Sequence, residues 1–96
     1  MIQSLADETT ADIFRERNTK AARQIPKALW RVVQRKLKML DVAARLDDLE
    51  SPPGNRLKVL KGQMKGRHSI RVNEQYRVTF RWENGHASEV AVEDYH

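Results

Sequence analysis

The sequence predicts an α+β fold in which N-terminal helices pack on one face of a mainly antiparallel β-sheet. Apolar residues recur about every 3.6 positions in the first half and every second position in the second half. A proline- and glycine-rich stretch at residues 51–55 separates the two patterns. The chain has 96 residues, enough for one hydrophobic core, so we expect residues 1–96 to form a single domain.

The first half contains two predicted helices and a short helical turn. Asp7 is suited to cap a helix over about residues 8–17, because its side chain can accept from free N–H groups of the first turn. Pro26 suits the first turn of a second helix, where its missing N–H would have no partner. A further turn over residues 46–49 ends at the break. The most regular pattern is the apolar face of the second helix, formed by Leu29, Val33, Leu37 and Leu40.

The second half alternates apolar and polar residues, as strands with one packed and one open face do. Asn84-Gly85 predicts a tight hairpin, because both central residues of the favoured two-residue turn need positive φ. Lys61-Gly62 should end the first strand. The predicted strands cover residues 56–60, 69–72, 76–82 and 89–93.

The alternation also predicts which side chains face the helices. Helices should bury one face of the sheet, so the apolar members of the longest strand must point toward them. The arginines of this strand and of the strand before it, Arg71, Arg77 and Arg81, would then point to the other side. We therefore expect the helix-free face to be open and basic. The side chains expected to face the helices are Tyr76, Val78, Phe80 and Trp82.

The charge is positive and concentrated in two segments. The formal net charge is +5, which is compatible with a polyanionic partner. Residues 15–38 carry nine Lys or Arg against one acid, and residues 56–81 carry eight against one. The first segment contains a line of cations spaced four apart, for which we expect contacts with RNA phosphates; a solvated helix face is the alternative. These cations are Arg23, Lys27, Arg31 and Arg35.

Composition also excludes several classes of protein. With no cysteine, the fold cannot depend on disulfides or thiolate metal sites. The three histidines are scattered, so we expect no metal site and no cofactor. His68 and His86 are interpreted as ordinary structural or surface residues, and Trp30 and Trp82 as packing residues. No stretch suits a leader or a membrane span, and we expect a cytoplasmic protein.

The second half contains a series of motifs, which are Arg56-Leu57-Lys58-Val59-Leu60-Lys61-Gly62, Ser69-Ile70-Arg71-Val72-Asn73, Tyr76-Arg77-Val78-Thr79-Phe80, Asn84-Gly85 and Glu93-Asp94-Tyr95-His96. Together, in this order, they resemble the HigB toxins of the RelE superfamily. The resemblance implies a RelE-like microbial RNase fold and a toxin of a type II toxin-antitoxin system, a ribosome-dependent endoribonuclease that cleaves mRNA in the decoding site without a metal. It also implies inhibition by a HigA-like helix-turn-helix antitoxin, through which alone the toxin would reach operator DNA.

The same resemblance implies a set of site residues. Several relatives have a histidine where this chain has Lys58. A lysine can hold a phosphate but is a poor proton shuttle near neutral pH, so His96 would carry more of the acid-base work. The family's functional residues fall by position on Lys61, Arg77, Asp94, Tyr95 and His96.

Cleavage of RNA needs removal of the 2'-OH proton, stabilisation of the phosphorane and protonation of the leaving oxygen. His96 is the best titrating candidate, with a frayed terminus as the alternative. Arg77 is the expected phosphate clamp, unless it pairs with Glu89 or Glu93. Lys61 would contact a phosphate or simply be solvated.

The roles of the remaining residues stay open. Tyr95 would stack on a base or pack at the edge of the core. Asp94 would orient His96 or Arg77, or cap its strand. Arg71 and Arg81 would add RNA contacts on the basic face.

Two other functions fit the predicted fold. A ParE-like relative would poison DNA gyrase and cut nothing, and it would not need the terminal Asp94-Tyr95-His96. A plain nucleic-acid-binding domain would need only the basic face. Deletion of Tyr95 and His96 separates these alternatives from a nuclease.

Overall fold

The computed structural model describes residues 1–94 of the chain. Its helices are α1 (Glu8–Phe14) and α2 (Trp30–Val42), and its strands are β1 (Lys58–Val59), β2 (Arg67–Arg71), β3 (Tyr76–Glu83) and β4 (His86–Asp94). Short 3-10 helices form the connections: η1 (Ala22–Gln24), η2 (Lys27–Leu29), η3 (Leu46–Glu50), η4 (Pro53–Asn55) and η5 (Gly62–Met64).

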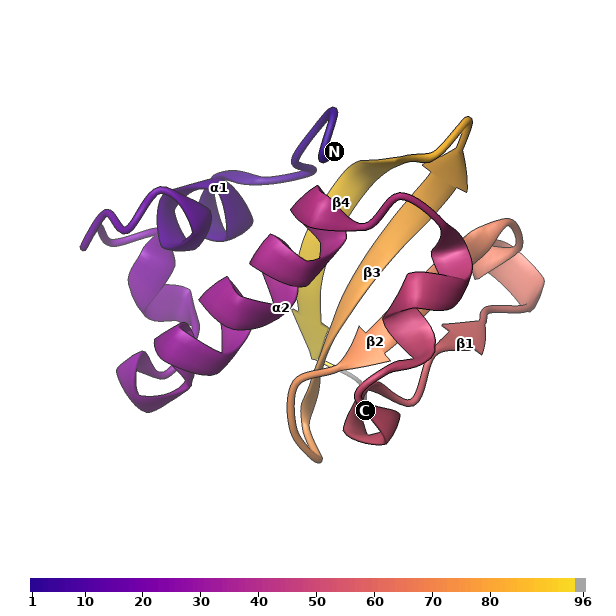
Figure 1. Cartoon of the computed structure of the whole chain (residues 1–96). Helices are drawn as coiled ribbons and strands as arrows, with labels where there is room; N and C mark the ends of the chain where they lie inside the picture. The colour runs from indigo at the N-terminus through magenta and orange to yellow at the C-terminus, as the bar shows by residue number, and fades with distance from the viewer. Residues whose placement is uncertain (95–96) are drawn as a thin grey trace.

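The strands form one antiparallel sheet in the order β1-β2-β3-β4, and the helices lie across one of its faces (Figure 1). The long β3-β4 hairpin turns at Asn84 and Gly85, whose φ values of 51° and 80° are those that the turn requires. The predicted α+β fold and the order of its elements are confirmed.

The N-terminal segment adds a feature that the sequence pattern did not predict. Ile2 pairs in parallel with Ala87, and Leu5 pairs in parallel with Val90. The amide of Gln3 donates to the Ala87 carbonyl at 2.7 Å, so the segment occupies backbone positions along the outer edge of β4. This arrangement covers one edge of the sheet, where unpaired backbone groups would otherwise be exposed.

The helices follow the predicted signals with shifted ends. The Asp7 side chain accepts from the Thr10 amide at 2.8 Å, as a helix cap should. Helix α1 ends at Phe14 rather than near Arg17, because Glu16 has a left-handed φ of 59°. Pro26 precedes a 3-10 turn instead of lying inside α2, which begins only at Trp30.

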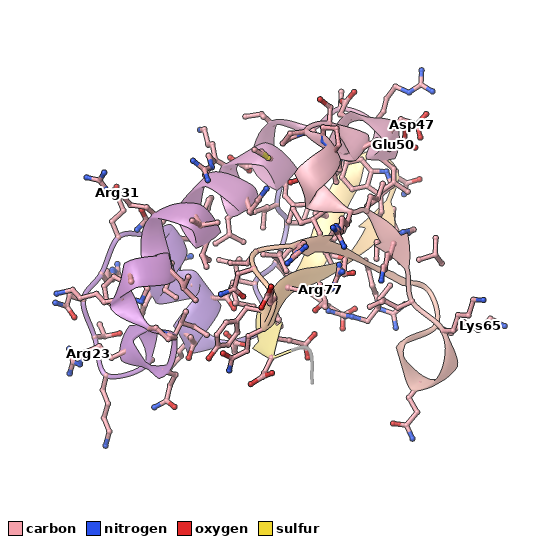
Figure 2. All side chains as sticks on the ribbon, turned by 90° about the horizontal axis from the view of Figure 1, so that it is seen from below. Arg23, Arg31, Asp47, Glu50, Lys65 and Arg77 are labelled. Carbon is pink, nitrogen blue, oxygen red and sulfur yellow. The ribbon has the colours of Figure 1, made fainter. Side chains whose placement is uncertain are left out.

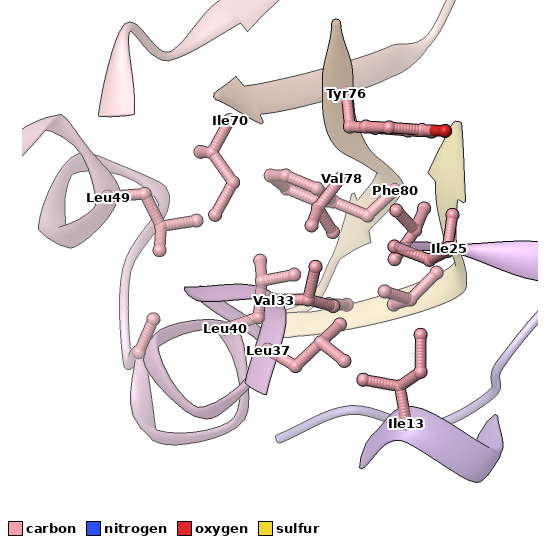
Figure 3. Packing of buried hydrophobic residues seen from close by; sticks show 14 of the residues in the cluster. Ile13, Ile25, Val33, Leu37, Leu40, Leu49, Ile70, Tyr76, Val78 and Phe80 are labelled. Carbon is pink, nitrogen blue, oxygen red and sulfur yellow. The ribbon is translucent and has the colours of Figure 1, made fainter. Parts of the chain in front are cut away.

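The predicted apolar face of α2 forms the centre of the core (Figure 3). Val33, Leu37 and Leu40 are completely buried and cluster with Val78 and Phe80 of the sheet. The spacing of the apolar residues therefore correctly predicted which side of α2 packs against the sheet. Leu29, at the end of η2, is only partly buried.

The helix-free face of the sheet is basic, as predicted, but the expectation that it is open is wrong at its centre. Arg77 and Thr79 are only 5% and 4% exposed. Arg67 lies across this face and donates to the Thr79 hydroxyl at 3.1 Å and to the Glu89 carbonyl at 2.7 Å. The Thr79 hydroxyl donates to the Glu93 carboxylate. Long polar side chains of the sheet therefore cover their own strands.

Two strands also depart from the expected pattern. The first strand contains only Lys58 and Val59 instead of residues 56–60, and Arg56 before it has a left-handed φ of 45°. In β4, Glu89 has a φ of 49° beside a register shift between Thr79 and Arg81. Such a bulge bends the strand and changes which side chains share a face.

We predict that Leu37→Ala lowers the free energy of unfolding by about 2–5 kcal/mol, because it removes buried methyl groups and leaves a cavity. Val42→Ala is the matched control on the same helix. Val42 is 66% exposed, and surface changes usually stay within about 0.5 kcal/mol. Urea unfolding measures both variants, and equal losses would contradict the assignment of this helix face to the core.

Candidate functional site

A depression of about 260 Å³ lies where the ends of β1, β2 and β3 meet on the helix-free side of the sheet. Its lining contains four cationic side chains and one carboxylate, so it is suited to an anion. Arg77 lies near the middle of the molecule in Figure 2. The residues that line the depression are Arg56, Lys58, Arg71, Asn73, Glu74 and Arg77.

Register explains why three of these cations lie together. Arg71 pairs directly with Arg77, and Lys58 pairs with Ser69, two residues before Arg71. Directly paired residues, and residues two apart in a strand, point to the same face. Lys58, Arg71 and Arg77 therefore share one side of three neighbouring strands.

Arg77 is the buried member of the group. Its Nη1 donates to the Ser69 hydroxyl at 3.1 Å, and its register partner on β4 is Glu93. A guanidinium keeps its charge in a protein, and a buried charge is costly unless it has partners. Arg77 therefore provides a fixed positive group in the lining of the depression.

The β2-β3 turn is held by Asn73. The Asn73 side-chain oxygen accepts from the amide of Gln75 at 2.9 Å and from that of Tyr76 at 2.7 Å. The short polar side chain thus substitutes for backbone partners in the turn. This arrangement places Glu74 at the rim of the depression.

A buried polar pair supports the loop that carries Arg56. Asn55 is completely buried, and its amide donates to the carbonyls of Leu49 at 3.1 Å and Ser51 at 3.3 Å. Lys36 of α2 donates to the Asn55 side-chain oxygen. Burial, and secondarily the charge of Arg35, lowers the pKa of Lys36.

Sequence reasoning missed Lys36, Asn55 and Arg56 as parts of this region. One signal was available for Lys36, which is three residues after Val33 and four before Leu40 and therefore lies on the buried side of α2. A lysine in that position needs a buried partner. Arg56 had no comparable signal in the sequence. Its position depends on the left-handed backbone conformation that it adopts at the end of η4.

The predicted site residues are only partly brought together. Lys58, Arg71 and Arg77 line the depression, whereas Lys61 is exposed at the start of η5 and outside that lining. Asp94 ends β4 opposite Tyr76 and accepts from the Gln75 side chain at 3.0 Å. The predicted roles of Tyr95 and His96 lie outside the described residues.

Arg81 lies farther along β3 and has a close ionic partner. Its Nε is 2.8 Å from a carboxylate oxygen of Glu89, and Arg67 lies 3.8 Å from the same carboxylate. The ion pair with Glu89 that we considered for Arg77 is therefore made by Arg81. This pairing leaves less positive charge available at Arg81 than the sequence suggested.

The cations of the helical layer do not form the continuous line that their spacing predicted. Arg23 belongs to η1 and Lys27 to η2, with the extended residue Ile25 between them; only Arg31 and Arg35 share α2. All four cations are nevertheless exposed. In Figure 2, Arg23 and Arg31 lie at the helical side of the molecule, away from Arg77.

His68 is a packing residue in this structure. Its ring stacks on Phe80 with centroids 5.8 Å apart, and its buried Nδ1 has no hydrogen-bond partner among the described residues. Trp30 donates to the Ile25 carbonyl at 2.9 Å, and Trp82 packs against the core, as the sequence predicted.

Neither a metal site nor a membrane span is found in the part of the chain that the structure describes. Residues 1–94 contain no group of three or more His, Cys, Asp or Glu suited to hold a metal ion. Within the same residues, no helix has the length and apolar character that crossing a bilayer requires.

The arrangement of helices and sheet is shared with solved structures of YoeB. The structure is similar to a chain of the YoeB-YefM complex from Staphylococcus aureus, with a TM-score of 0.62, 18% identity and coverage of 100% of this chain and 98% of that one. It is also similar to the YoeB dimer from Staphylococcus aureus, with a TM-score of 0.61, 22% identity and coverage of 97% and 93%. At these identities the likeness establishes the fold.

The amino-acid sequence identifies the family to which the chain belongs. Residues 3–96 match the family of RelE-like toxins of the type II toxin-antitoxin system HigB, and the chain belongs to this family. It is 48% identical over 66 residues to Toxin HigB-1 of Vibrio cholerae serotype O1, covering 69% of this chain and 70% of that protein. It is also 43% identical over 61 residues to an uncharacterized protein of Haemophilus influenzae, covering 64% of this chain and 60% of that protein.

Family membership confirms the resemblance that the second half of the sequence indicated. The protein is a toxin of a type II toxin-antitoxin system, and its partner is an antitoxin.

We predict that His68 makes the protein less stable as the pH falls. Burial lowers the pKa of His68 below its ordinary value of 6.5, so the unfolded chain binds more protons than the folded one between the two values. Stability should therefore fall as the pH decreases through 6.5 toward the folded pKa, and His68→Gln should reduce this loss. Urea unfolding at about pH 7.5 and pH 5 compares the two proteins. An NMR titration of the His68 ring centred at or above 6.5 would contradict the prediction.

Proposed function

We propose that the protein is a metal-independent endoribonuclease that cleaves mRNA on the ribosome. The observation that carries this proposal is the depression lined by four cations, with the buried Arg77 among them. Fixed cations in a confined site stabilise the charge that develops on a phosphorane. Membership of the HigB-like toxin family supports the same activity.

In the proposed reaction the RNA supplies its own nucleophile, the 2'-OH. Arg77 contacts two oxygens of the scissile phosphate through its planar fork, and Lys58 and Arg71 add charge on the same face of the sheet. Arg56 contributes a further cation from the loop before β1. Lys61 is exposed and follows Lys58 by three residues in the sequence, and it contacts an adjacent phosphate.

The proposed proton transfer uses the end of the chain. Asp94 is paired with Tyr76, the neighbour of Arg77, and two residues of extended chain span at most about 7 Å. We assign His96 to proton transfer, because imidazole titrates close to neutral pH. Asp94 orients this end of the chain, and Tyr95 stacks on a base of the RNA.

The proposed partners follow from the family and the charge. A HigA-like helix-turn-helix antitoxin inhibits the toxin and provides its contact with operator DNA. The small ribosomal subunit presents the mRNA, and the exposed cations of the helical layer bind ribosomal RNA. These events take place in the cytoplasm. The helical-layer cations are Arg23, Lys27, Arg31 and Arg35.

We predict that Arg77→Ala slows cleavage by about 10²- to 10³-fold, because it removes a fixed group at the developing charge. Arg45→Ala is the matched control, since Arg45 is exposed beside Asp47 in the acidic part of the chain. Mapping of transcript 5' ends after induction measures the activity, and urea unfolding verifies that the variants fold. Arg77→Lys provides a second test, because it keeps the charge but removes the fork, and it should also be slow. Wild-type protein that leaves translated messages uncut would contradict the proposed function.

Deletion of Tyr95 and His96 distinguishes the nuclease from the two other functions. Growth inhibition should disappear together with mRNA cleavage if His96 moves a proton in the reaction. His96→Ala should give the same loss by itself. Growth inhibition that persists without new 5' ends would instead favour a gyrase poison or a binding domain.

We also predict that Arg31→Ala and Arg35→Ala weaken binding to ribosomes without changing the position of the cut. Each phosphate contact that is lost should lower the slope of log affinity against log salt by about 1. Arg45→Ala again serves as the control, because its charge lies beside Asp47. Sedimentation with ribosomes over a range of KCl concentrations gives the slopes. Unchanged slopes for both variants would show that this surface is only solvated.

A further inference from the structure

We propose that Glu74 is the general base that removes the 2'-OH proton, an assignment that rests on the proposed nuclease function. Among the six side chains that line the depression, Glu74 alone has the chemistry for this task. The guanidinium groups of Arg56, Arg71 and Arg77 and the ammonium group of Lys58 are donors without an acceptor site. The neutral amide of Asn73 is not a base. A carboxylate accepts protons and is the natural partner of a 2'-OH beside a bound phosphate.

The structure holds Glu74 in a fixed turn. On one side, the Asn73 side chain accepts from two backbone amides of the turn. On the other side, Gln75 donates to the carboxylate of Asp94 at the end of β4. Glu74 therefore lies between two anchored residues, although its own side chain is exposed at the rim of the depression. An anchored backbone and an exposed carboxylate suit a group that must meet an incoming RNA.

Neighbouring carboxylates are placed for other tasks. Glu93 accepts from the Thr79 hydroxyl, and Asp94 accepts from Gln75. Neither of them lines the depression. Of the three carboxylates Glu74, Glu93 and Asp94, Glu74 is thus the one that lines the depression together with the cations.

The step balances without an external reagent. The Glu74 carboxylate takes the 2'-OH proton while the 2'-oxygen forms a bond to phosphorus. The bond from phosphorus to the 5'-oxygen breaks, and His96 donates a proton to that oxygen. The products are a 2',3'-cyclic phosphate and a 5'-hydroxyl end. Arg77 and Lys58 hold the non-bridging oxygens during the exchange.

The test uses the full-length toxin and a synthetic mRNA bound to ribosomes, cleaved at the bond that 5'-end mapping identifies. Glu74→Gln should slow cleavage by about 10²- to 10⁴-fold while binding of the toxin to the programmed ribosome stays the same or tightens, because the change removes a base and a negative charge. Glu74→Asp, which retains a shorter carboxylate, should recover part of the rate. Glu50→Gln is the matched control, because Glu50 is exposed and lies far from Arg77 in Figure 2.

A second mRNA separates the base from the acid. In this mRNA a sulfur atom replaces the bridging 5'-oxygen at the cleaved bond. A thiol has a pKa of about 8.5, so a thiolate leaves without a donated proton. His96→Ala should therefore cut the sulfur-containing mRNA at close to the wild-type rate. Glu74→Gln should remain slow on it, because the 2'-OH still has to lose its proton.

Each outcome decides one assignment. A Glu74→Gln variant that cleaves the unmodified mRNA at the wild-type rate would overturn the role of Glu74 and leave the proposed function intact. Rescue of Glu74→Gln by the sulfur atom would overturn it as well, because the residue would then act on the leaving group. Wild-type protein that leaves the mRNA whole would overturn the proposed function itself.

Discussion

The burial of a permanent positive charge in the sheet is the constraint on which the rest of the structure depends. Arg77 lies on a central strand and is only 5% exposed, so the helix-free face has to supply polar neighbours for its charge. Ser69 accepts a hydrogen bond from Arg77, and Glu93 is the register partner of Arg77 on β4. Thr79, two residues along β3, donates to Glu93 and accepts from Arg67. The opposite face of the sheet has to exclude water, and its apolar side chains pack against α2. One sheet thus separates an apolar core from a polar network.

The cations at one end of the sheet destabilise the folded protein and favour binding of an anion. Lys58, Arg71 and Arg77 point to the same face of adjacent strands, where like charges repel. A bound phosphate would relieve this repulsion, and any ligand that binds only the folded state stabilises it. Glu74 lies at the rim and reduces the local positive charge in the free protein. The same charges that weaken the free protein therefore strengthen its complex with an anion.

The periodic parts of the fold were predictable, because burial against a neighbouring layer imposes the period. Val33 and Leu37 follow the helix period, and the alternation within the strands placed Arg71 and Arg77 on the same face of the sheet. The parallel pairing of Ile2 was not predictable, because such a short segment displays no period. The burial of Arg77 was missed because it depends on side chains that are distant in sequence. The left-handed turn before β1 likewise depends on loop geometry and on a buried lysine of α2.

The molecule has two basic surfaces, the depression and the exposed cations of the helical layer, and they would contact different parts of an RNA partner. The depression opens on the helix-free face, whereas Arg31 and Arg35 belong to the helical layer that covers the other face. The molecule measures 32 × 26 × 26 Å, and a helix packs roughly 10 Å from the structure on which it rests. One short RNA strand in the depression would have to turn around an edge of the molecule to reach these arginines. A large particle with RNA on several sides would meet both surfaces at once, and the charge distribution therefore supports the proposal of a ribosome-bound substrate.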